Sequence, residues 1–231
     1  MAINLTDAKK KHHLYNCIAA ANASKYVSDE YTCELGLQAS YSHKPDREFD
    51  NEEWHLNHSI AVEKSIDYLK TNFPGIIIFD SESIKIKQRI GKATLFGIPD
   101  IIAVNNNKLY VVDGKSGRAK GYHRYQASLY ALMLLRQNVA SEIGEVFLGY
   151  YDPKLKLNNF NMVSLGGHNK IQDIWSIDSK EKIVNLANAI VSDQKLEAKP
   201  SSTNCQWCGW KNRCSVSYKE SEELLDVFAG F

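Results

Sequence analysis

The pattern of apolar and polar positions predicts one long amphipathic helix over residues 51–72. Asp50 or Asn51 can cap its first turn, because short polar side chains accept hydrogen bonds from the unpaired N–H groups there. Pro74 and Gly75 end the helix, since proline cannot continue it and glycine favours a turn. The residues of its apolar face recur at helical spacing, and they are Trp54, Ala61, Val62, Ile66 and Leu69.

The same pattern predicts helices and strands on both sides of this helix. Residues 6–41 are mostly helical in composition, and a polar tail with cysteines closes the chain. The order of the elements indicates an α/β or α+β fold with a mixed sheet. At 231 residues, with no internal repeat, we expect a single domain spanning residues 1–231. The predicted strands are 83–90, 94–104, 108–112, 146–151 and 155–163, and the further helices are 123–137 and 179–193.

Two of these strands form a hairpin that brings two acidic side chains together. The asparagines at 105–107 supply a three-residue turn between strands 94–104 and 108–112, because asparagine tolerates positive φ. Partners in a hairpin face one another across the ladder. We therefore expect Asp100 and Asp113 to lie side by side on rigid strands.

Neighbouring carboxylates repel each other unless a cation lies between them, and oxygen ligands suit Mg²⁺ or Mn²⁺. Lys115 follows Asp113 by two residues, so the period of a strand places both side chains on one side. There the ammonium can orient a water molecule or stabilise charge that develops on a phosphate. Asp100, Asp113 and Lys115 are thus the predicted catalytic residues of a divalent-metal site.

The segment around the hairpin is basic, although the whole chain has a net charge of +1. Residues 84–125 contain nine lysines and arginines but only two aspartates. Such an excess is typical of a surface that meets phosphates, with an ordinary solvated face as the alternative. The apolar runs are too short for a membrane-spanning helix, and the first fifteen residues do not resemble a secretory signal. We expect a cytoplasmic protein without a membrane partner.

Five cysteines, an odd number, favour metal or cluster ligation over disulfides in a reducing compartment. Cys205, Cys208 and Cys214 form a compact C-x₂-C-x₅-C set near the end of the chain. Three thiolates are one short of a tetrahedral zinc site or a cubane cluster. A fourth ligand must therefore come from elsewhere in the chain.

The segments GIPD, DGK and QASLY, which begin at residues 97, 113 and 126, resemble three motifs of one nuclease family. The G-x-x-D, (D/E)-x-K and Q-x-x-x-Y motifs are those of the RecB-type PD-(D/E)xK nucleases. The resemblance implies an α/β restriction-endonuclease-like core with a mixed central sheet flanked by helices. It also implies metal ligation by Asp100 and Asp113, catalysis assisted by Lys115, and DNA contacts from Gln126 and Tyr130. The neighbouring basic residues Arg118, Lys120 and Arg124 are expected to contact DNA as well.

In this family a histidine from an upstream helix also binds the metal. The helix predicted over residues 51–72 offers His55 and His58, both near its apolar face. We favour His58, which projects nearest the middle of the apolar stripe, and keep His55 as the alternative.

The cysteine tail, with one remote N-terminal cysteine, resembles the iron–sulfur subgroup of these nucleases. That subgroup includes AddB and the CRISPR-associated RecB-like exonucleases, and its N-terminal ligand follows a short helix start containing serine, as in residues 23–33 here. The resemblance implies that Cys33 joins Cys205, Cys208 and Cys214 around a structural [4Fe–4S] cluster. Residues 24–41 and 200–218 would form this subregion, with Cys17 as the alternative to Cys33 and Zn²⁺ as the alternative to the cluster.

These observations predict a metal-dependent DNA nuclease, an exonuclease acting on single strands or DNA ends. The resemblance implies DNA as a partner, with protein partners from CRISPR adaptation or recombination repair. A catalytically silent DNA-binding or scaffold subunit with a structural zinc site is the alternative, but it has no need for an intact Asp100, Asp113 and Lys115. A sequence-specific restriction-type endonuclease would need a recognition domain, and 231 residues leave no obvious one.

Overall fold

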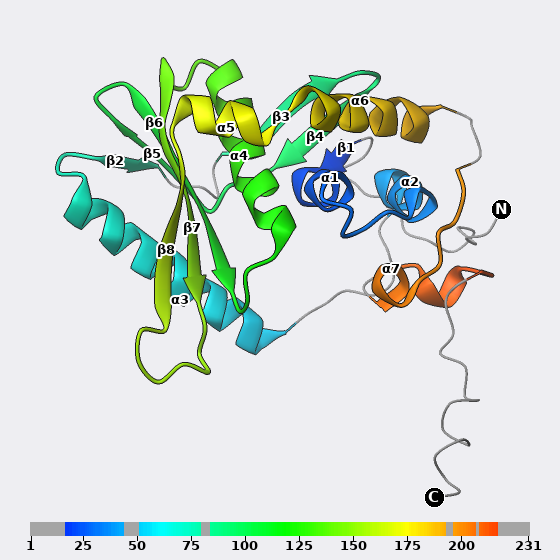
Figure 1. Cartoon of the computed structure of the whole chain (residues 1–231), viewed down its shortest axis with the longest axis horizontal. Helices are drawn as coiled ribbons and strands as arrows, with labels where there is room; N and C mark the ends of the chain where they lie inside the picture. Colours follow the sequence, from blue (N-terminus) through cyan, green and yellow to red (C-terminus); the bar gives the residue numbers. More distant parts are fainter. Residues whose placement is uncertain (1–16, 44–50, 80–83, 193–195, 207, 217–231) are drawn as a thin grey trace, which may run out of the picture.

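The computed structural model describes residues 17–43, 51–79, 84–192, 196–206 and 208–216 of the chain. A five-stranded sheet with the strand order β2-β5-β6-β7-β8 occupies one end of the molecule (Figure 1). Strands β6 and β7 run parallel and the other neighbours run antiparallel, so the sheet is mixed, as predicted. Its strands are β2 (Ile77–Phe79), β5 (Ile101–Asn105), β6 (Lys108–Ser116), β7 (Glu142–Tyr151) and β8 (Phe160–Gly166).

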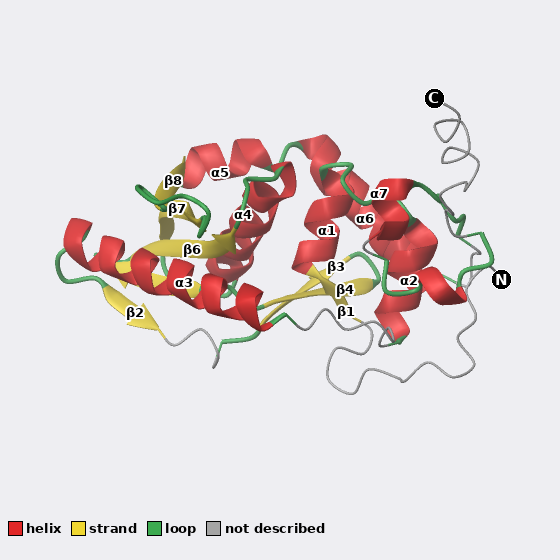
Figure 2. Cartoon of the chain, turned by 90° about the horizontal axis from the view of Figure 1, so that it is seen from below, coloured by secondary structure: helices red, strands yellow, loops and turns green. Residues whose placement is uncertain are grey.

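Helices cover both faces of this sheet. Helix α3 (Glu52–Asn72) lies along one face, whereas α4 (Gly121–Arg136) and α5 (His168–Ile174) lie on the other (Figures 1 and 2). Successive side chains of a strand point to opposite faces. Ile101 and Ala103 accordingly pack in the core under α3, while Ile102 packs in the core under α4. Burial on both faces explains why the central strands read as continuous apolar runs.

A second, three-stranded sheet with the order β1-β4-β3 lies beside the first. Helices α1 and α2, at the N-terminal side, and α6 pack against it. Beyond α2 lies the cysteine segment, whose Trp210 is buried against Leu35 and Ala39 of α2. The elements of this half are β1 (Cys17–Ala19), α1 (Ala20–Val27), α2 (Glu34–Ser42), β3 (Ile86–Ile90), β4 (Ala93–Gly97), α6 (Ile177–Val191), α7 (Ser202–Gln206) and a 3₁₀ turn (Lys211–Arg213).

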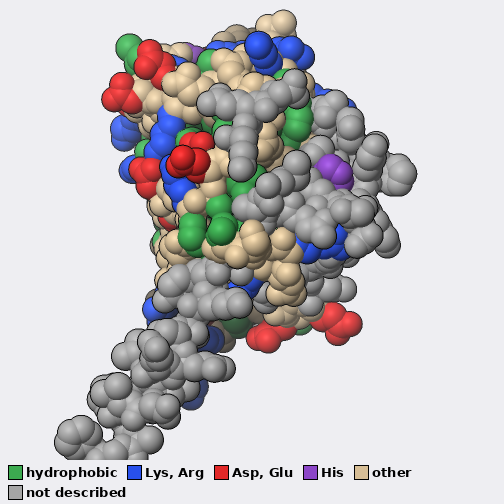
Figure 3. Space-filling model, turned by 90° about the vertical axis from the view of Figure 1, so that its right-hand side faces the viewer, with side chains coloured by type: hydrophobic (Ala, Val, Ile, Leu, Met, Phe, Trp, Pro, Cys, Tyr) green, Lys and Arg blue, Asp and Glu red, His purple; other side chains and the backbone are tan. Residues whose placement is uncertain are grey.

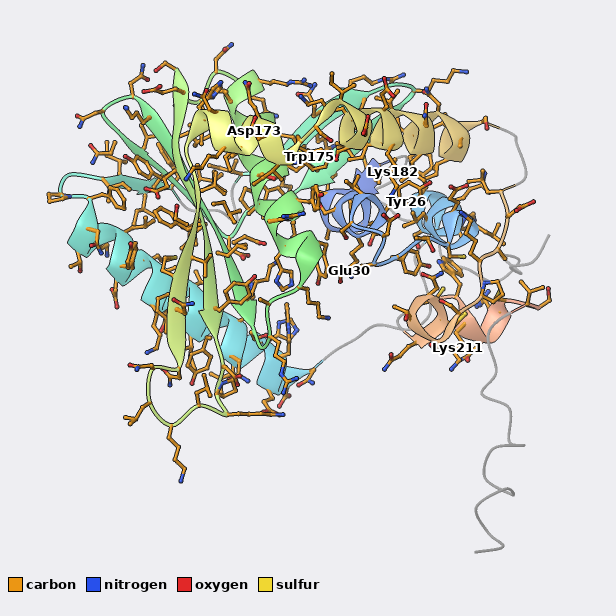
Figure 4. The ribbon with its side chains drawn as sticks, viewed as in Figure 1. Tyr26, Glu30, Asp173, Trp175, Lys182 and Lys211 are labelled. Atoms are coloured by element: carbon orange, nitrogen blue, oxygen red, sulfur yellow. The ribbon has the colours of Figure 1, made fainter. Side chains whose placement is uncertain are left out.

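Helix α6 contacts helix α1 and the loop that follows it. The Lys182 ammonium of α6 lies 5.5 Å from the ring centroid of Tyr26 and forms an ion pair with Asp29 (Figure 4). On the end of the molecule that carries α2 and the cysteine segment, acidic and basic side chains are interspersed (Figure 3).

The expected strand 94–104 is wrong as one element, because it is divided between the two sheets. Strand β4 ends at Gly97 and pairs with β3, whereas β5 begins at Ile101 and pairs with β6. Pro99, which lacks an N–H group, stands at the break. The hairpin itself is confirmed, although Asn105 pairs with Lys108 and leaves a two-residue turn in place of the expected three. Asn106 and Asn107 have φ of 49° and 60°, as a tight hairpin turn requires.

The long helix is confirmed over Glu52–Asn72, with Asn51 accepting a hydrogen bond from the Trp54 N–H at 3.1 Å. Trp54 itself is 48% exposed, so its place on the apolar face is wrong; that face begins at Ala61, where the helix reaches the sheet. Helix α4 is confirmed close to its expected bounds. Strand β8 starts at Phe160, later than the expected Leu155.

Sequence patterns missed several short elements, namely β1, β2 and α5. Three-residue strands carry too few positions to show a period, so propensity alone cannot find them. Residues 6–16 of the expected N-terminal helical region lie outside the described residues. In the part of the chain that the structure describes, no helix has the length and apolar character needed to cross a membrane.

Candidate active site

The two predicted acidic residues meet at the beginning of β5 and near the end of β6. Ile101 pairs with Val112, which makes Asp100 and Asp113 the next positions of the ladder. The backbone N–H of Gly114 donates a hydrogen bond to Oδ2 of Asp100 at 2.7 Å and fixes that carboxylate. Asp113 is 1% exposed. The hairpin therefore places two carboxylates side by side on rigid strands, as predicted.

Lys115 lies against both the acidic pair and helix α4. Its Nζ is 2.6 Å from Oδ2 of Asp113 and donates a hydrogen bond to Oε1 of Gln126 at 3.3 Å. The two groups form a close ion pair whose approach is not that of a well-aligned hydrogen bond, and the ammonium compensates the buried carboxylate by charge.

Gln126 and Tyr130 are one helical turn apart and hydrogen-bonded to each other. Nε2 of Gln126 donates to the Tyr130 hydroxyl at 2.9 Å. Both residues are buried, at 8% and 4% exposure. In this arrangement Gln126 holds Lys115 and Tyr130 holds Gln126, while their contact with DNA stays a prediction.

Two glycines of the motifs are required by close packing. A Cβ on Gly97 would lie 2.3 Å from the ring of Tyr130, so the glycine of G-x-x-D makes room for the tyrosine of Q-x-x-x-Y. A Cβ on Gly114 would lie 3.0 Å from Val62 of α3. These close approaches bring α4 onto the end of β4 and α3 onto β6, the strand that carries Asp113.

Helix α3 brings one histidine to the acidic pair. Nε2 of His58 lies 3.2 Å from Oδ2 of Asp100. His55 lies on the exposed side of the helix, edge-on to Trp54 at a centroid distance of 5.0 Å. The ring of Trp54 stacks on His58, also at 5.0 Å. The structure thus joins His58 to the carboxylates and does not join His55 to them.

Burial and charge shift the pKa values of these groups in different directions. Burial raises the pKa of Asp113 to about 7, with Lys115 opposing the rise. Burial also disfavours the Asp100 carboxylate, but the hydrogen bond with His58 and nearby positive charge lower its pKa. That same hydrogen bond raises the pKa of His58 against the effect of burial. For Lys115, burial lowers the pKa, and the charges of Asp113 and Asp100 outweigh it and raise the pKa.

A second histidine, His123, lies close to this site and was missed by the sequence analysis. It is 3% exposed, and its Nδ1 accepts a hydrogen bond from the Lys120 N–H at 3.3 Å and lies 3.1 Å from the Tyr150 hydroxyl. Burial, followed by the charge of Lys115, lowers its pKa to about 3, so it is neutral at physiological pH. Its spacing from Gln126 and Tyr130 places all three on one helical face, a signal that could have found it.

The three basic residues predicted to contact DNA are exposed around the start of α4. The Arg124 guanidinium lies 5.0 Å from the ring centroid of Tyr125. The Lys120 ammonium lies 6.0 Å from that of Tyr122. Arg118 lies in the loop that joins β6 to α4. All three flank the strand end that carries Lys115.

The four predicted cysteine ligands line a single small cavity, whereas Cys17 lines a different one. All five are free thiols. Asn204 ties the two segments together, because its Oδ1 accepts from the Thr32 N–H at 3.1 Å and its Nδ2 donates to Oγ1 of Thr32 at 3.2 Å. The Tyr31 hydroxyl adds a hydrogen bond to Sγ of Cys208 at 3.5 Å. Sequence reasoning did not find Asn204 or Tyr31.

Comparison with known proteins agrees with this geometry. The sequence matches the PD-(D/E)XK nuclease superfamily over residues 9–215, and the chain belongs to that family. The family expected from the motifs is therefore confirmed at the level of the superfamily. Comparison with curated proteins gives no match.

Three solved structures, two of them of the same protein, are similar to this chain. The crystal structure of SSO0001 has a TM-score of 0.50 at 18% identity and covers 90% of this chain and 89% of that one. An alkaline exonuclease from Laribacter hongkongensis has a TM-score of 0.46 at 12% identity, covering 77% of this chain and 91% of its own. The complex of that exonuclease with dAMP has a TM-score of 0.48 at 9% identity, covering 76% of this chain and 88% of its own. The first of these likenesses shows a shared fold.

PD-(D/E)XK nucleases generally use Mg²⁺ or Mn²⁺. As they stand, no three His, Cys, Asp or Glu side chains among the described residues form a group that could hold a metal ion. The donor set nevertheless fits a hard divalent cation, because the buried carboxylate of Asp113 lies beside that of Asp100. Asp100, Asp113 and His58 are the residues that would hold it.

Proposed function

We propose that this chain is a divalent-metal-dependent nuclease that hydrolyses phosphodiester bonds of DNA, acting as an exonuclease on single strands or DNA ends. One observation carries the proposal: the buried Oδ2 of Asp113 lies beside Asp100 and forms an ion pair with the Lys115 ammonium at 2.6 Å. A buried charge persists only when another group compensates it. A site made of two carboxylates and an ammonium therefore suits a cation and a phosphate together.

Each residue has a distinct task in this proposal. A bound Mg²⁺ or Mn²⁺ would polarise the scissile phosphate and lower the pKa of a water molecule. Asp100 and Asp113 supply its oxygen ligands, and His58 orients Asp100 and adds a nitrogen. Lys115 faces the phosphate and stabilises the negative charge that grows on it. Gln126 and Tyr130 hold Lys115 in position, in addition to any contact with DNA.

The wider setting belongs to the same proposal. Residues 1–231 form a single nuclease domain in a cytoplasmic protein, and Arg118, Lys120 and Arg124 bind the DNA backbone. Protein partners in CRISPR adaptation or recombination repair are in keeping with the motifs. The intact acidic pair and lysine support an enzyme over a silent DNA-binding subunit.

The purified protein tests this function directly. We expect release of nucleotides from end-labelled single-stranded DNA with Mg²⁺ or Mn²⁺, and no reaction in chelator. Circular single-stranded DNA of the same length is the matched control, because an exonuclease needs an end. Cutting of the circle would replace the exonuclease mode with an endonuclease mode. No cleavage of any DNA with either metal would refute the nuclease.

His58→Ala should weaken metal binding and slow cleavage by about 10- to 100-fold, because it removes one ligand and the partner of Asp100. His55→Ala is the matched control, one turn earlier on the same helix, and should retain nearly the full rate. Titration of the rate with Mn²⁺ measures the change in metal affinity. An equal loss from His55→Ala would move the ligand to His55, and full activity in both variants would remove histidine from the site.

We propose further that Cys33, Cys205, Cys208 and Cys214 bind a structural [4Fe–4S] cluster, as the resemblance to the iron–sulfur subgroup implies, with Zn²⁺ as the alternative. Two observations support a metal centre here: the four thiols border one cavity, and Asn204 holds the N-terminal and C-terminal segments together beside it. The cavity is about 20 Å³, so the thiols would have to move apart to admit a cubane. Of the proposed subregion, residues 207, 217 and 218 lie outside the described residues.

Protein purified without oxygen should be brown and contain iron and sulfide. Cys33→Ala should lose the colour and unfold at a lower temperature, because a ligand bound only by the folded chain stabilises it. Cys17→Ala is the matched control and should stay brown, since Cys17 lines a separate cavity. A colourless wild-type protein with one zinc per chain would rule out the cluster. Colour in Cys33→Ala and none in Cys17→Ala would make Cys17 the ligand.

A further inference from the structure

A cavity of about 340 Å³ lies between α1, the start of α4 and the cysteine segment. We name it the α1–α4 cavity; its wall includes Lys25, Glu30, Tyr31, Lys120, Tyr122 and Trp210. Glu30 lies on the loop after α1, on the side of α4 (Figure 4). The volume is at the lower end of the roughly 300–1,000 Å³ typical of ligand sites. It has room for about one nucleotide and not for a duplex.

Two lysines of the wall gather around one aromatic ring. The Lys25 ammonium lies 5.1 Å and the Lys120 ammonium 6.0 Å from the ring centroid of Tyr122. Lys25 is half-buried. Burial lowers its pKa, and the charges of Lys120 and Lys115 lower it further, so the three ammonium groups are near enough to repel one another. The cavity therefore carries an excess of positive charge, and Lys115 is near enough to Lys25 for the two charges to interact.

The carboxylate of Glu30, in the wall of the cavity, is hydrogen-bonded to the first turn of α4. Oε1 of Glu30 accepts a hydrogen bond from the Tyr122 N–H at 3.0 Å and so caps the N-terminus of α4. Its charge raises the pKa of Lys25 without forming an ion pair. Across the described ranges, no carboxylate lies at ion-pair distance from Lys25. A half-buried ammonium in this setting favours an anion from a ligand.

We propose that the α1–α4 cavity binds one unpaired nucleotide of the DNA strand, next to the phosphate held at the acidic pair. Lys25 and Lys120 contact its phosphate, and its base meets the aromatic wall of Tyr31 and Tyr122, as bases do in other single-strand sites. This inference rests on the proposed nuclease function and assigns the single strand named there to a particular cavity. The strand that enters the site must be single, because a paired base does not fit the cavity.

Binding to a fluorescent oligothymidine in chelator, measured by anisotropy, tests the inference apart from catalysis. Lys25→Ala should weaken this binding about tenfold, the loss expected for one charge-assisted hydrogen bond. The slope of log Kd against log salt should fall by about 0.7. Lys25→Arg keeps the charge and should retain most of the affinity. Lys108→Ala is the matched control, because Lys108 is exposed on β6 and forms an ion pair with Glu142 of β7. This variant should change Kd by less than about twofold.

Thermal unfolding of each variant shows whether it is folded, and Lys25→Gln replaces Lys25→Ala should the latter unfold. Unchanged affinity in the folded Lys25 variant, or an equal loss in Lys108→Ala, would overturn the inference. A wild-type protein that cuts duplex DNA but does not bind the single strand would also overturn it, while leaving the nuclease intact. Lys25-dependent binding without cleavage of any DNA would instead refute the proposed function and keep the binding site.

Discussion

Asp113→Asn should abolish DNA cleavage, with a rate about 10³-fold or more below that of the wild type. The side chain is 1% exposed and is compensated in the metal-free protein by the Lys115 ammonium 2.6 Å away, so a buried carboxylate is held where a cation can bind. An amide has the same shape, but it lacks the charge and is a much poorer ligand for a hard metal. Initial rates on end-labelled single-stranded DNA, in Mg²⁺ and in Mn²⁺, measure the loss.

Metal binding supplies a second readout for the same variant. Mg²⁺ or Mn²⁺ should raise the melting temperature of the wild type, because a ligand of the folded state stabilises it, and should not raise that of Asp113→Asn. DNA affinity should persist, since the proposed phosphate contacts of Arg118, Lys120 and Arg124 are unchanged. Asp173→Asn makes the identical change at an exposed position of α5 and serves as the control (Figure 4). Wild-type cleavage by Asp113→Asn would mean that the hairpin is not the active site.

Lys115→Ala should lower kcat by about 10²- to 10³-fold, the range for one preorganised donor, with a smaller change in KM. Asp113 and Asp100 raise the pKa of Lys115 against the effect of burial, so the ammonium is charged when DNA arrives. It is also held by Gln126 at 3.3 Å, which limits its motion before the reaction. Single-turnover rates at saturating DNA isolate the chemical step from binding.

Removing this ammonium should also destabilise the metal-free protein. Asp100 and Asp113 would then repel each other without the positive charge that compensates them. Removing one partner of a buried ion pair lowers the free energy of unfolding. Lys115→Ala should therefore melt below the wild type in chelator and recover when Mn²⁺ is added. Lys108→Ala, at the exposed start of β6, is the control on the same strand. A Lys115→Ala enzyme that keeps more than about one tenth of the rate would remove this lysine from catalysis.

The hairpin was predictable from the sequence because its geometry is local. Turn chemistry at Asn106 and Asn107 fixes the register, and the two-residue period of a strand then fixes where Asp100, Asp113 and Lys115 point. Helices α3 and α4 were likewise found from their periodicity. The break at Pro99 was overlooked, since an apolar run alone does not tell one strand from two strands in different sheets.

The remaining members of the site depend on packing between distant segments. The pattern of α3 favoured His58 only slightly over His55, and the way that helix crosses the sheet brings His58 to Asp100. The same crossing leaves Trp54 exposed, although helical spacing had placed it inside. Glu30 reaches the start of α4 from 92 residues away.

The sequence by itself determined the acidic pair, its lysine, the mixed α/β architecture and the cysteine set, because each is written in short-range spacing. The tertiary structure decided what spacing cannot encode: that Cys33 shares a cavity with the tail cysteines while Cys17 does not, and that Lys25 is gathered beside Lys115. Those arrangements follow from how α1 and α2 dock on α4 and on the C-terminal segment. The packing of these helices depends on many apolar side chains that are buried together, so no single sequence motif predicts it.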